Sequence, residues 1–147
     1  MIMRNLLRQI RKSETGASAV EFALAAPIAL ILMVGVIQVG IAMQGYNAIR
    51  GMVGDLARHT VVRYSTGVDL ADDQIEADAM ARATAAPYLL NADNLVIDVQ
   101  SAESSGIGGV KQIDVTVSYA VRSIIPGLDA DQFPMTLEKS IYVVDET

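Results

Sequence analysis

Residues 22–43 read FALAAPIALILMVGVIQVGIAM, and Gln38 is the only strongly polar side chain in this run of 22 residues. At 1.5 Å per residue the run forms a helix of roughly 33 Å, which matches the roughly 30 Å hydrocarbon core of a bilayer. Pro27 lies early in the run, where it predicts a kink and not the end of the helix. The sequence therefore predicts one membrane-spanning helix.

The residues before this run and the rest of the chain carry opposite net charge. Residues 1–16 hold four basic residues and one acidic residue, a net charge of +3, whereas residues 17–147 hold seven basic and 16 acidic residues, a net charge of −9. A basic N-terminal flank predicts that this end stays in the cytoplasm and that the C-terminal part is translocated. The acidic remainder argues against nucleic acid as a partner, because no basic surface is available to replace phosphate counterions.

Glu21 places a carboxylate at the start of the apolar run. Ionisable groups at membrane depth are costly and usually face a protein partner, although a position near the interface leaves Glu21 within reach of water. A cleaved secretory signal has an apolar centre of only about 7–15 residues, followed by a small-x-small cleavage site. Gly40-Ile41-Ala42 has that spacing, so cleavage after Ala42 is an alternative, but such a signal gains nothing from Glu21.

The segment GASAVEFALAAPIALILMVGVIQVG, residues 16–40, resembles the TadE-like family of minor pilins or pseudopilins from the tight-adherence (Tad, or Flp) pilus system. The family's pattern of a glycine, small residues, Val-Glu-Phe-Ala-Leu and a proline is matched by Gly16, Val20, Glu21, Phe22, Ala23, Leu24 and Pro27. The family often carries an acidic residue near the end of the anchor, and this chain has Gln38 there. The chain therefore lacks the charge that the family often places there.

The resemblance implies processing and a set of partners. A prepilin peptidase would cut between Gly16 and Ala17, and Glu21 and Phe22 would then serve processing or assembly. Glu21 would pair with the new amino group of a neighbouring subunit, or it would serve peptidase recognition alone. The implied partners are the peptidase, other pilin or minor pilin subunits such as a second TadE- or TadF-like protein, the assembly platform and membrane lipid. The implied location is the bacterial inner membrane, with the C-terminal domain in the periplasm.

The expected organisation is a basic leader over residues 1–16, a transmembrane helix over residues 17–43 and an extracytoplasmic domain over residues 44–147. Side chains at helical spacing predict that the helix continues as an amphipathic helix up to Ser65-Thr66-Gly67, with one face formed by Tyr46, Ile49, Val53, Leu56, Thr60 and Tyr64. Asp73 and Glu76 predict a capping box before a second helix over residues 75–86, ended by Pro87. Its small side chains are expected to let it approach the first helix closely; these are Ala77, Ala79 and Ala83.

The remainder of the chain alternates apolar and polar residues, which predicts strands around residues 95–100, 113–121 and 135–143. Lys139 breaks the alternation of the third. Residues 104–109 predict a flexible hairpin loop, and Pro126-Gly127 predict a second connection. The expected fold class is α+β: a long N-terminal helix, a second short helix and a three-stranded antiparallel sheet of the pilin or pseudopilin kind.

No catalytic, cofactor or metal site is expected, and the chain is expected to be a structural subunit and not an enzyme. His59 and Ser65 lack a strand-turn-helix context for a catalytic triad. The chain has no cysteine, and an acidic cluster lacks the EF-hand pattern, which leaves a loose calcium site as an alternative; the cluster is Asp69, Asp72, Asp73, Glu76 and Asp78. The rival functions are a membrane-tethered periplasmic binding or sensor domain with an uncleaved anchor, and a tethered hydrolase that depends on His59.

Overall fold

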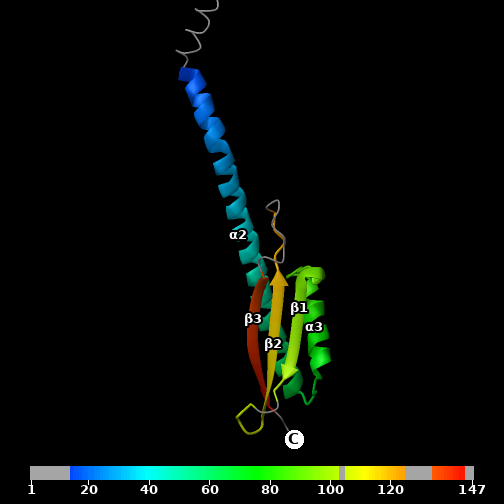
Figure 1. Ribbon diagram of the computed structural model, residues 1–147. Coiled ribbons are helices and arrows are strands. Elements are labelled where there is room, and N and C mark those ends of the chain that lie inside the picture. The colour runs from blue at the N-terminus through cyan, green and yellow to red at the C-terminus, as the bar shows by residue number, and fades with distance from the viewer. Residues whose placement is uncertain (1–13, 103–104, 125–133, 145–147) are drawn as a thin grey trace, which may run out of the picture. The chain divides into compact units, whose positions relative to one another are not determined.

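The computed structural model describes residues 14–102, 105–124 and 134–144. They form helices α2 (Glu14–Ser65) and α3 (Asp72–Thr84), the 3-10 helix η1 (Ala92–Asn94), and strands β1 (Leu95–Ser101), β2 (Val110–Ala120) and β3 (Pro134–Val144) (Figure 1). A long apolar helix, a short helix and a three-stranded antiparallel sheet confirm the predicted α+β class. The chain divides into two compact units, residues 1–39 and residues 40–147.

The described part of the first unit is the N-terminal portion of α2. The helix continues through Pro27, as predicted. Large apolar side chains here are mostly exposed, among them Phe22 at 74% and Leu32 at 66%. Within the described residues one helix is long and apolar enough to cross a membrane, and its most apolar 18-residue stretch is 0% buried. The core helix of a soluble protein would be mostly buried, so the surface of this helix is available to lipid or to other proteins.

In the second unit α2 turns one face toward the core. The buried side chains follow helical spacing, and they are Ile49, Met52, Val53, Leu56 and Thr60. The prediction for Tyr46 is wrong, because its side chain is exposed. In this turn of α2 the buried residue is the adjacent Gly45. A Cβ built on Gly45 would lie 3.2 Å from Cε of Met135, so the glycine lets the helix backbone approach the sheet. The helix ends at Ser65 as predicted, and Gly67 follows with a φ of +77°.

Helix α3 begins three residues before the predicted start. The side-chain oxygen Oε1 of Gln74 accepts a hydrogen bond from the backbone N–H of Ala71 at 3.3 Å, and Asp73 accepts one from the backbone N–H of Gln74 at 2.9 Å. The predicted capping box of Asp73 and Glu76 is therefore wrong. The helix starts at Asp72, where Gln74 caps the preceding Ala71, and Asp72 is also bound to Ser101 at the end of β1.

The small side chains of α3 are not all on its buried face. Ala79 and Ala83 are fully buried, but Ala77 is exposed, so the expectation for Ala77 is wrong. The helix ends at Thr84, two residues before the predicted end, and the N–H of Ala85 closes its last turn on the carbonyl of Ala81 at 3.2 Å. α3 lies alongside β1 (Figure 1), and side-chain packing links it to α2 through the common core.

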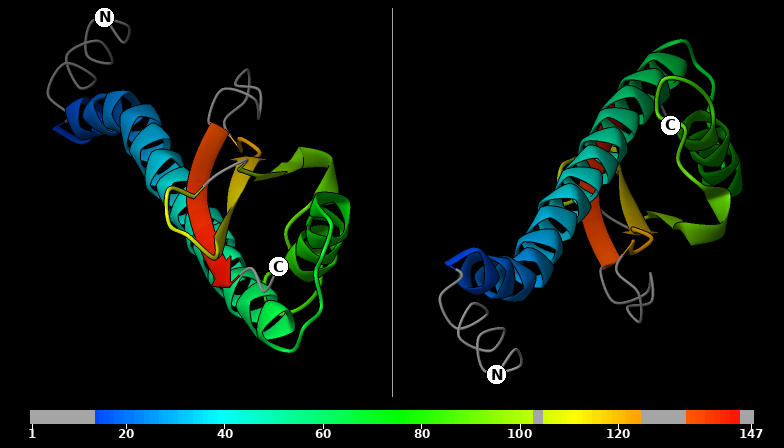
Figure 2. Two further views of the ribbon diagram at one scale, coloured as in Figure 1. Left: turned by 90° about the horizontal axis from the view of Figure 1, so that it is seen from below. Right: turned by 90° about the horizontal axis from the view of Figure 1, so that it is seen from above.

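The three strands pair antiparallel in the order β1-β2-β3. The register pairs Ile97 with Val117 and Ile113 with Ile141, which puts the predicted apolar sets on one face. Both helices cover this face, and the core lies between them and the sheet (Figure 2). Gly106 and Gly109, with φ of +72° and +73°, lie in the predicted loop between β1 and β2. Residues 103–104 of that loop and the Pro126-Gly127 connection lie outside the described residues.

Candidate functional site

The predicted processing residues lie near the start of α2. Gly16 and Ala17 are exposed, and so are Glu21 and Phe22 in the following turns. Within the described part of the chain, the carboxylate of Glu21 has neither a hydrogen bond nor an ion pair. An unpaired carboxylate at the start of an apolar helix is costly in a low-dielectric environment, so a partner outside this chain would stabilise it.

The two predicted anchor features differ in exposure. Pro27 is exposed and does not end the helix. Gln38 is only 7% exposed, whereas its neighbours Ile37 and Val39 are 47% and 63% exposed. Gln38 therefore does not present a free polar group to the surroundings of the helix.

His59 of α2 lies next to Asp78 of α3, and both side chains are partly exposed. Its Nδ1 lies 3.1 Å from Oδ2 of Asp78, although Nδ1 is buried and the geometry is not that of a hydrogen bond. Asp78 also accepts a hydrogen bond from Nε of Arg82 at 2.8 Å. The hydroxyl of Ser65 donates to the carbonyl of Val62 at 2.8 Å. The structure thus brings His59 to an aspartate and directs the Ser65 hydroxyl elsewhere.

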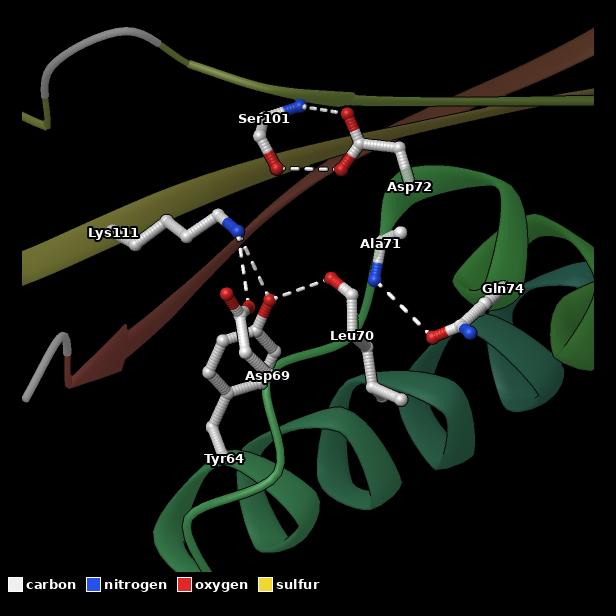
Figure 3. Close-up of polar contacts among 8 residues, drawn as sticks. All are labelled: Tyr64, Asp69, Leu70, Ala71, Asp72, Gln74, Ser101 and Lys111. Carbon is white, nitrogen blue, oxygen red and sulfur yellow. Dashed lines mark hydrogen bonds and ion pairs between the residues drawn. The ribbon is translucent and has the colours of Figure 1, made fainter.

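The acidic residues around the start of α3 point to separate partners. Asp72 accepts hydrogen bonds from the backbone N–H of Ser101 at 2.9 Å and from its hydroxyl at 2.5 Å (Figure 3). Asp69 pairs with Lys111 at 3.3 Å, and Asp78 pairs with Arg82. Over the described ranges, no three His, Asp or Glu residues are grouped as metal ligands. Asp72 and Asp69 therefore attach the start of α3 and the preceding loop to the sheet, whereas Asp78 pairs with Arg82 within α3.

Tyr64, Asp69 and Lys111 form a polar cluster that joins the end of α2, the following loop and β2 (Figure 3). Nζ of Lys111 donates to Tyr64 Oη at 3.1 Å and to Asp69, while the Tyr64 hydroxyl donates to the carbonyl of Leu70 at 2.8 Å. Burial, together with Asp69, raises the pKa of Tyr64 despite the opposing effect of Lys111. Burial would lower the pKa of Lys111, but its contacts with Tyr64 and Asp69 outweigh burial and raise it. The neighbouring Tyr64 hydroxyl and the Lys111 ammonium group lower the pKa of Asp69.

A second long-range contact was missed from the sequence. The Tyr88 hydroxyl donates to Oδ2 of Asp55 at 2.5 Å, and a Cβ built on Gly51 would lie 2.9 Å from Cε1 of Tyr88. The glycine thus leaves room for the Tyr88 ring against α2. No periodicity or motif links these residues, because the hydrogen-bonded pair is 33 positions apart.

One family model, described as TadE-like protein, matches residues 16–58. The comparisons with curated proteins and with solved structures found no match. The matched region contains all the residues on which the resemblance was based, and it extends past the apolar run into the buried part of α2. The predicted resemblance to the TadE-like family is therefore confirmed over residues 16–58.

Proposed function

We propose that the chain is a TadE-like minor pilin or pseudopilin, a structural subunit for assembly of a Tad pilus that carries out no chemistry itself. The observation that carries this proposal is where the family match begins. It starts at Gly16, the residue after which a prepilin peptidase is expected to cut, and it leaves out the basic leader. In this proposal residues 22–43 hold the protein in the inner membrane, with the leader in the cytoplasm and residues 44–147 in the periplasm.

Processing changes the charge at the start of the helix. Water adds across the amide bond between Gly16 and Ala17, which leaves a carboxylate on the released leader and an ammonium group on Ala17. A small, exposed residue such as Gly16 suits a peptidase that must reach the backbone. The subunit then begins with a positive charge four residues before Glu21.

The new ammonium group gives Glu21 a partner in an assembly. A buried or lipid-facing carboxylate costs several kcal/mol when unpaired, and an ammonium group on an adjacent subunit offsets much of that cost. Because both charges lie near the start of the same helix, pairing between subunits fixes the axial register of adjacent helices. Glu21 is exposed and has no partner within the described residues, which is compatible with this role.

The cleavage is tested by the intact mass and N-terminal sequence of the protein made with and without the peptidase. We expect the wild type to lose 16 residues and begin at Ala17 only when the peptidase is present. Gly16→Leu should stay uncut, while Gly35→Leu should be cut, because a Cβ on Gly35 meets nothing within 4 Å. A mature chain that begins anywhere else refutes the processing step. An uncut wild type favours a tethered binding or sensor domain.

The pairing is tested with Glu21→Gln, which keeps the shape of the side chain and removes its charge. We expect normal membrane insertion but a loss of pili of tenfold or more, since about 1.4 kcal/mol corresponds to a factor of ten. Glu138→Gln is a matched control on an exposed residue of β3. Pilus yields equal to wild type for Glu21→Gln, in cells that still process the subunit, would count against the pairing.

A further inference from the structure

The second unit contains a groove of about 540 Å³ at the end where the chain passes from the first unit into the second. Its walls are the first turns of α2 in this unit, the segment 87–90 that follows α3, and the end of β2. The described residues that line it include Ile41, Gln44, Tyr88, Tyr119 and Arg122. The lining is therefore largely apolar and aromatic, with a few polar groups.

Leu89 is held at this groove in an unusual way. Its φ is +50°, a left-handed conformation that is costly for a residue with a branched side chain, and the side chain is 72% exposed. Both neighbours are fixed, because Leu90 is buried and the Tyr88 hydroxyl is bound to Asp55. The N–H groups of Leu89 and Leu90 donate to the carbonyls of Ala85 and Ala83 at 3.0 and 2.9 Å. The fold thus holds a large apolar side chain outward at a fixed place.

The groove begins within the apolar run itself. Residues 40–43 belong both to the second unit and to the run that is expected to span the bilayer, and Ile41 lines the groove. The part of α2 that lines it ends at Ala48, five residues beyond Met43, which is about 8 Å of helix. The headgroup layer on each side of a bilayer is about 5–8 Å thick. The groove therefore lies at the height of the headgroups if residues 22–43 span the membrane.

The composition of the groove lining is also compatible with a position among lipid headgroups. Residues 40–147 hold seven basic and 15 acidic residues, a net charge of −8. In contrast to this acidic total, the described residues that line the groove include no carboxylate. Tyrosine side chains such as those of Tyr88 and Tyr119 are enriched at membrane–water interfaces, because they join an apolar ring to a polar hydroxyl.

We propose that this end of the second unit rests on the bilayer, with Leu89 inserted among the upper acyl chains and the groove occupied by phospholipid headgroups. The proposal rests on the membrane anchoring assumed in the proposed function. It assigns the segment 87–90 a role that neither the processing of Gly16 nor the pairing of Glu21 requires. It also gives a physical reason for an exposed leucine in a costly backbone conformation.

The absence of cysteine allows the contact to be measured in the full chain. Single substitutions Leu89→Cys, Ile107→Cys and Leu32→Cys would each carry a nitroxide label, with the protein reconstituted in phosphatidylcholine vesicles. Ile107 is a matched control, since it is 60% exposed but lies in the turn at the opposite end of β2. Leu32 reports on the anchor. For each nitroxide label, the relaxation caused by oxygen, which concentrates in lipid, would be compared with the relaxation caused by a water-soluble nickel complex.

We expect labels at 32 and 89 to favour oxygen severalfold over the label at 107. A label at 32 in lipid with a label at 89 in water overturns this inference and leaves the anchor intact. A label at 32 in water overturns the anchor itself. Equal lipid exposure of the labels at 89 and 107 would overturn the claim that the groove end of the second unit is the end that contacts the bilayer. The label at 89 could also be shielded from the nickel complex only while the protein is concentrated in the vesicles. Loss of this shielding when the protein is diluted with lipid would identify a second copy of the chain as the occupant, and it would also overturn the proposal.

Discussion

Replacing Asp72 by alanine tests how α3 is attached to the sheet. Asp72 is the first residue of α3, and its carboxylate accepts two hydrogen bonds from Ser101 at the end of β1. Both groups are partly buried. Alanine leaves the N–H and the hydroxyl of Ser101 without this partner, and it removes a negative charge from the N-terminus of the helix.

The expected loss follows from these contacts. A hydrogen bond to a charged group contributes about 1.5–3 kcal/mol when buried, and partial access to water reduces this to about 1 kcal/mol for each of the two bonds. The charge at the helix N-terminus adds roughly 0.3–1 kcal/mol. We therefore expect Asp72→Ala to lower the free energy of unfolding by roughly 2–3 kcal/mol.

Asp73→Ala is the matched control. Asp73 lies in the same first turn and is exposed, and its hydrogen bond is to the adjacent N–H of Gln74. Like Asp72, Asp73 places a negative charge at the N-terminus of α3, but it makes no hydrogen bond to Ser101 of β1. Its loss should be about 0.5–1 kcal/mol. The difference between the two variants isolates the contact with Ser101.

Urea unfolding of the full chain in detergent, followed by near-UV circular dichroism, measures this difference. All five tyrosines lie in the second unit and the chain has no tryptophan, so the signal reports on that unit; the tyrosines are Tyr46, Tyr64, Tyr88, Tyr119 and Tyr142. With a slope of roughly 1–3 kcal/mol per molar urea, Asp72→Ala should move the midpoint by about 1 M or more. A midpoint shift no larger than that of Asp73→Ala would refute the assigned role of the Ser101 contact.

Two further predictions concern the same unit. The raised pKa values of Tyr64 and Lys111 contribute stability that is complete below their ordinary values of 10.0 and 10.5 and is lost as the pH rises through the higher folded values. The urea midpoint of the wild type should therefore fall more steeply above pH 10 than that of the double variant Tyr64→Phe/Lys111→Met, which lacks both groups, and parallel curves would contradict this. Gly54→Ala should raise the free energy of unfolding by up to about 1 kcal/mol, because alanine favours the helix and a Cβ there meets nothing within 4 Å. Gly51→Ala should gain less or lose stability, because its Cβ displaces the ring of Tyr88; equal gains in urea unfolding would argue against that contact.

The elements that depend on local pattern could be predicted from the sequence. The 3.6-residue spacing of Ile49, Val53 and Leu56 predicted the buried face of α2, and the alternation in residues 113–117 predicted the inner face of β2. Both patterns reflect one buried face per element, so they remain visible without tertiary information. The family pattern in residues 16–27 was also visible, because its residues are close together in the sequence, and the family model matches this region.

The errors arose where distant residues decide the outcome. Asp72 attaches the start of α3 to Ser101 of β1, 29 positions away, and no local pattern reveals this contact. Tyr46 is exposed because the adjacent Gly45 occupies the contact with β2 and β3. The link between Lys111 and Asp69 spans 42 positions, and no local signal reveals it. Polar contacts of this kind form between residues that only the packed fold brings together. Local sequence patterns reveal which faces of the helices and strands are apolar, but they do not reveal these contacts.

Three groups of exposed apolar side chains in this chain have different physical meanings. Val96, Tyr142 and Val144 are spread over the outer face of the sheet, and isolated exposed residues of this kind are normal for a soluble surface. Lys139 lies on the edge strand β3 opposite the buried Val115, so it is on the inner face of the sheet, but its side chain is exposed. A charge at such a position opposes pairing of the edge strand with another sheet. The β3 edge of the sheet is thus protected from pairing, whereas residues 22–39 expose an apolar surface without such charges. The apolar surface that remains open to association is therefore that of the first unit, and the proposed membrane contact of Leu89 would add the end of the second unit that includes residues 40–43.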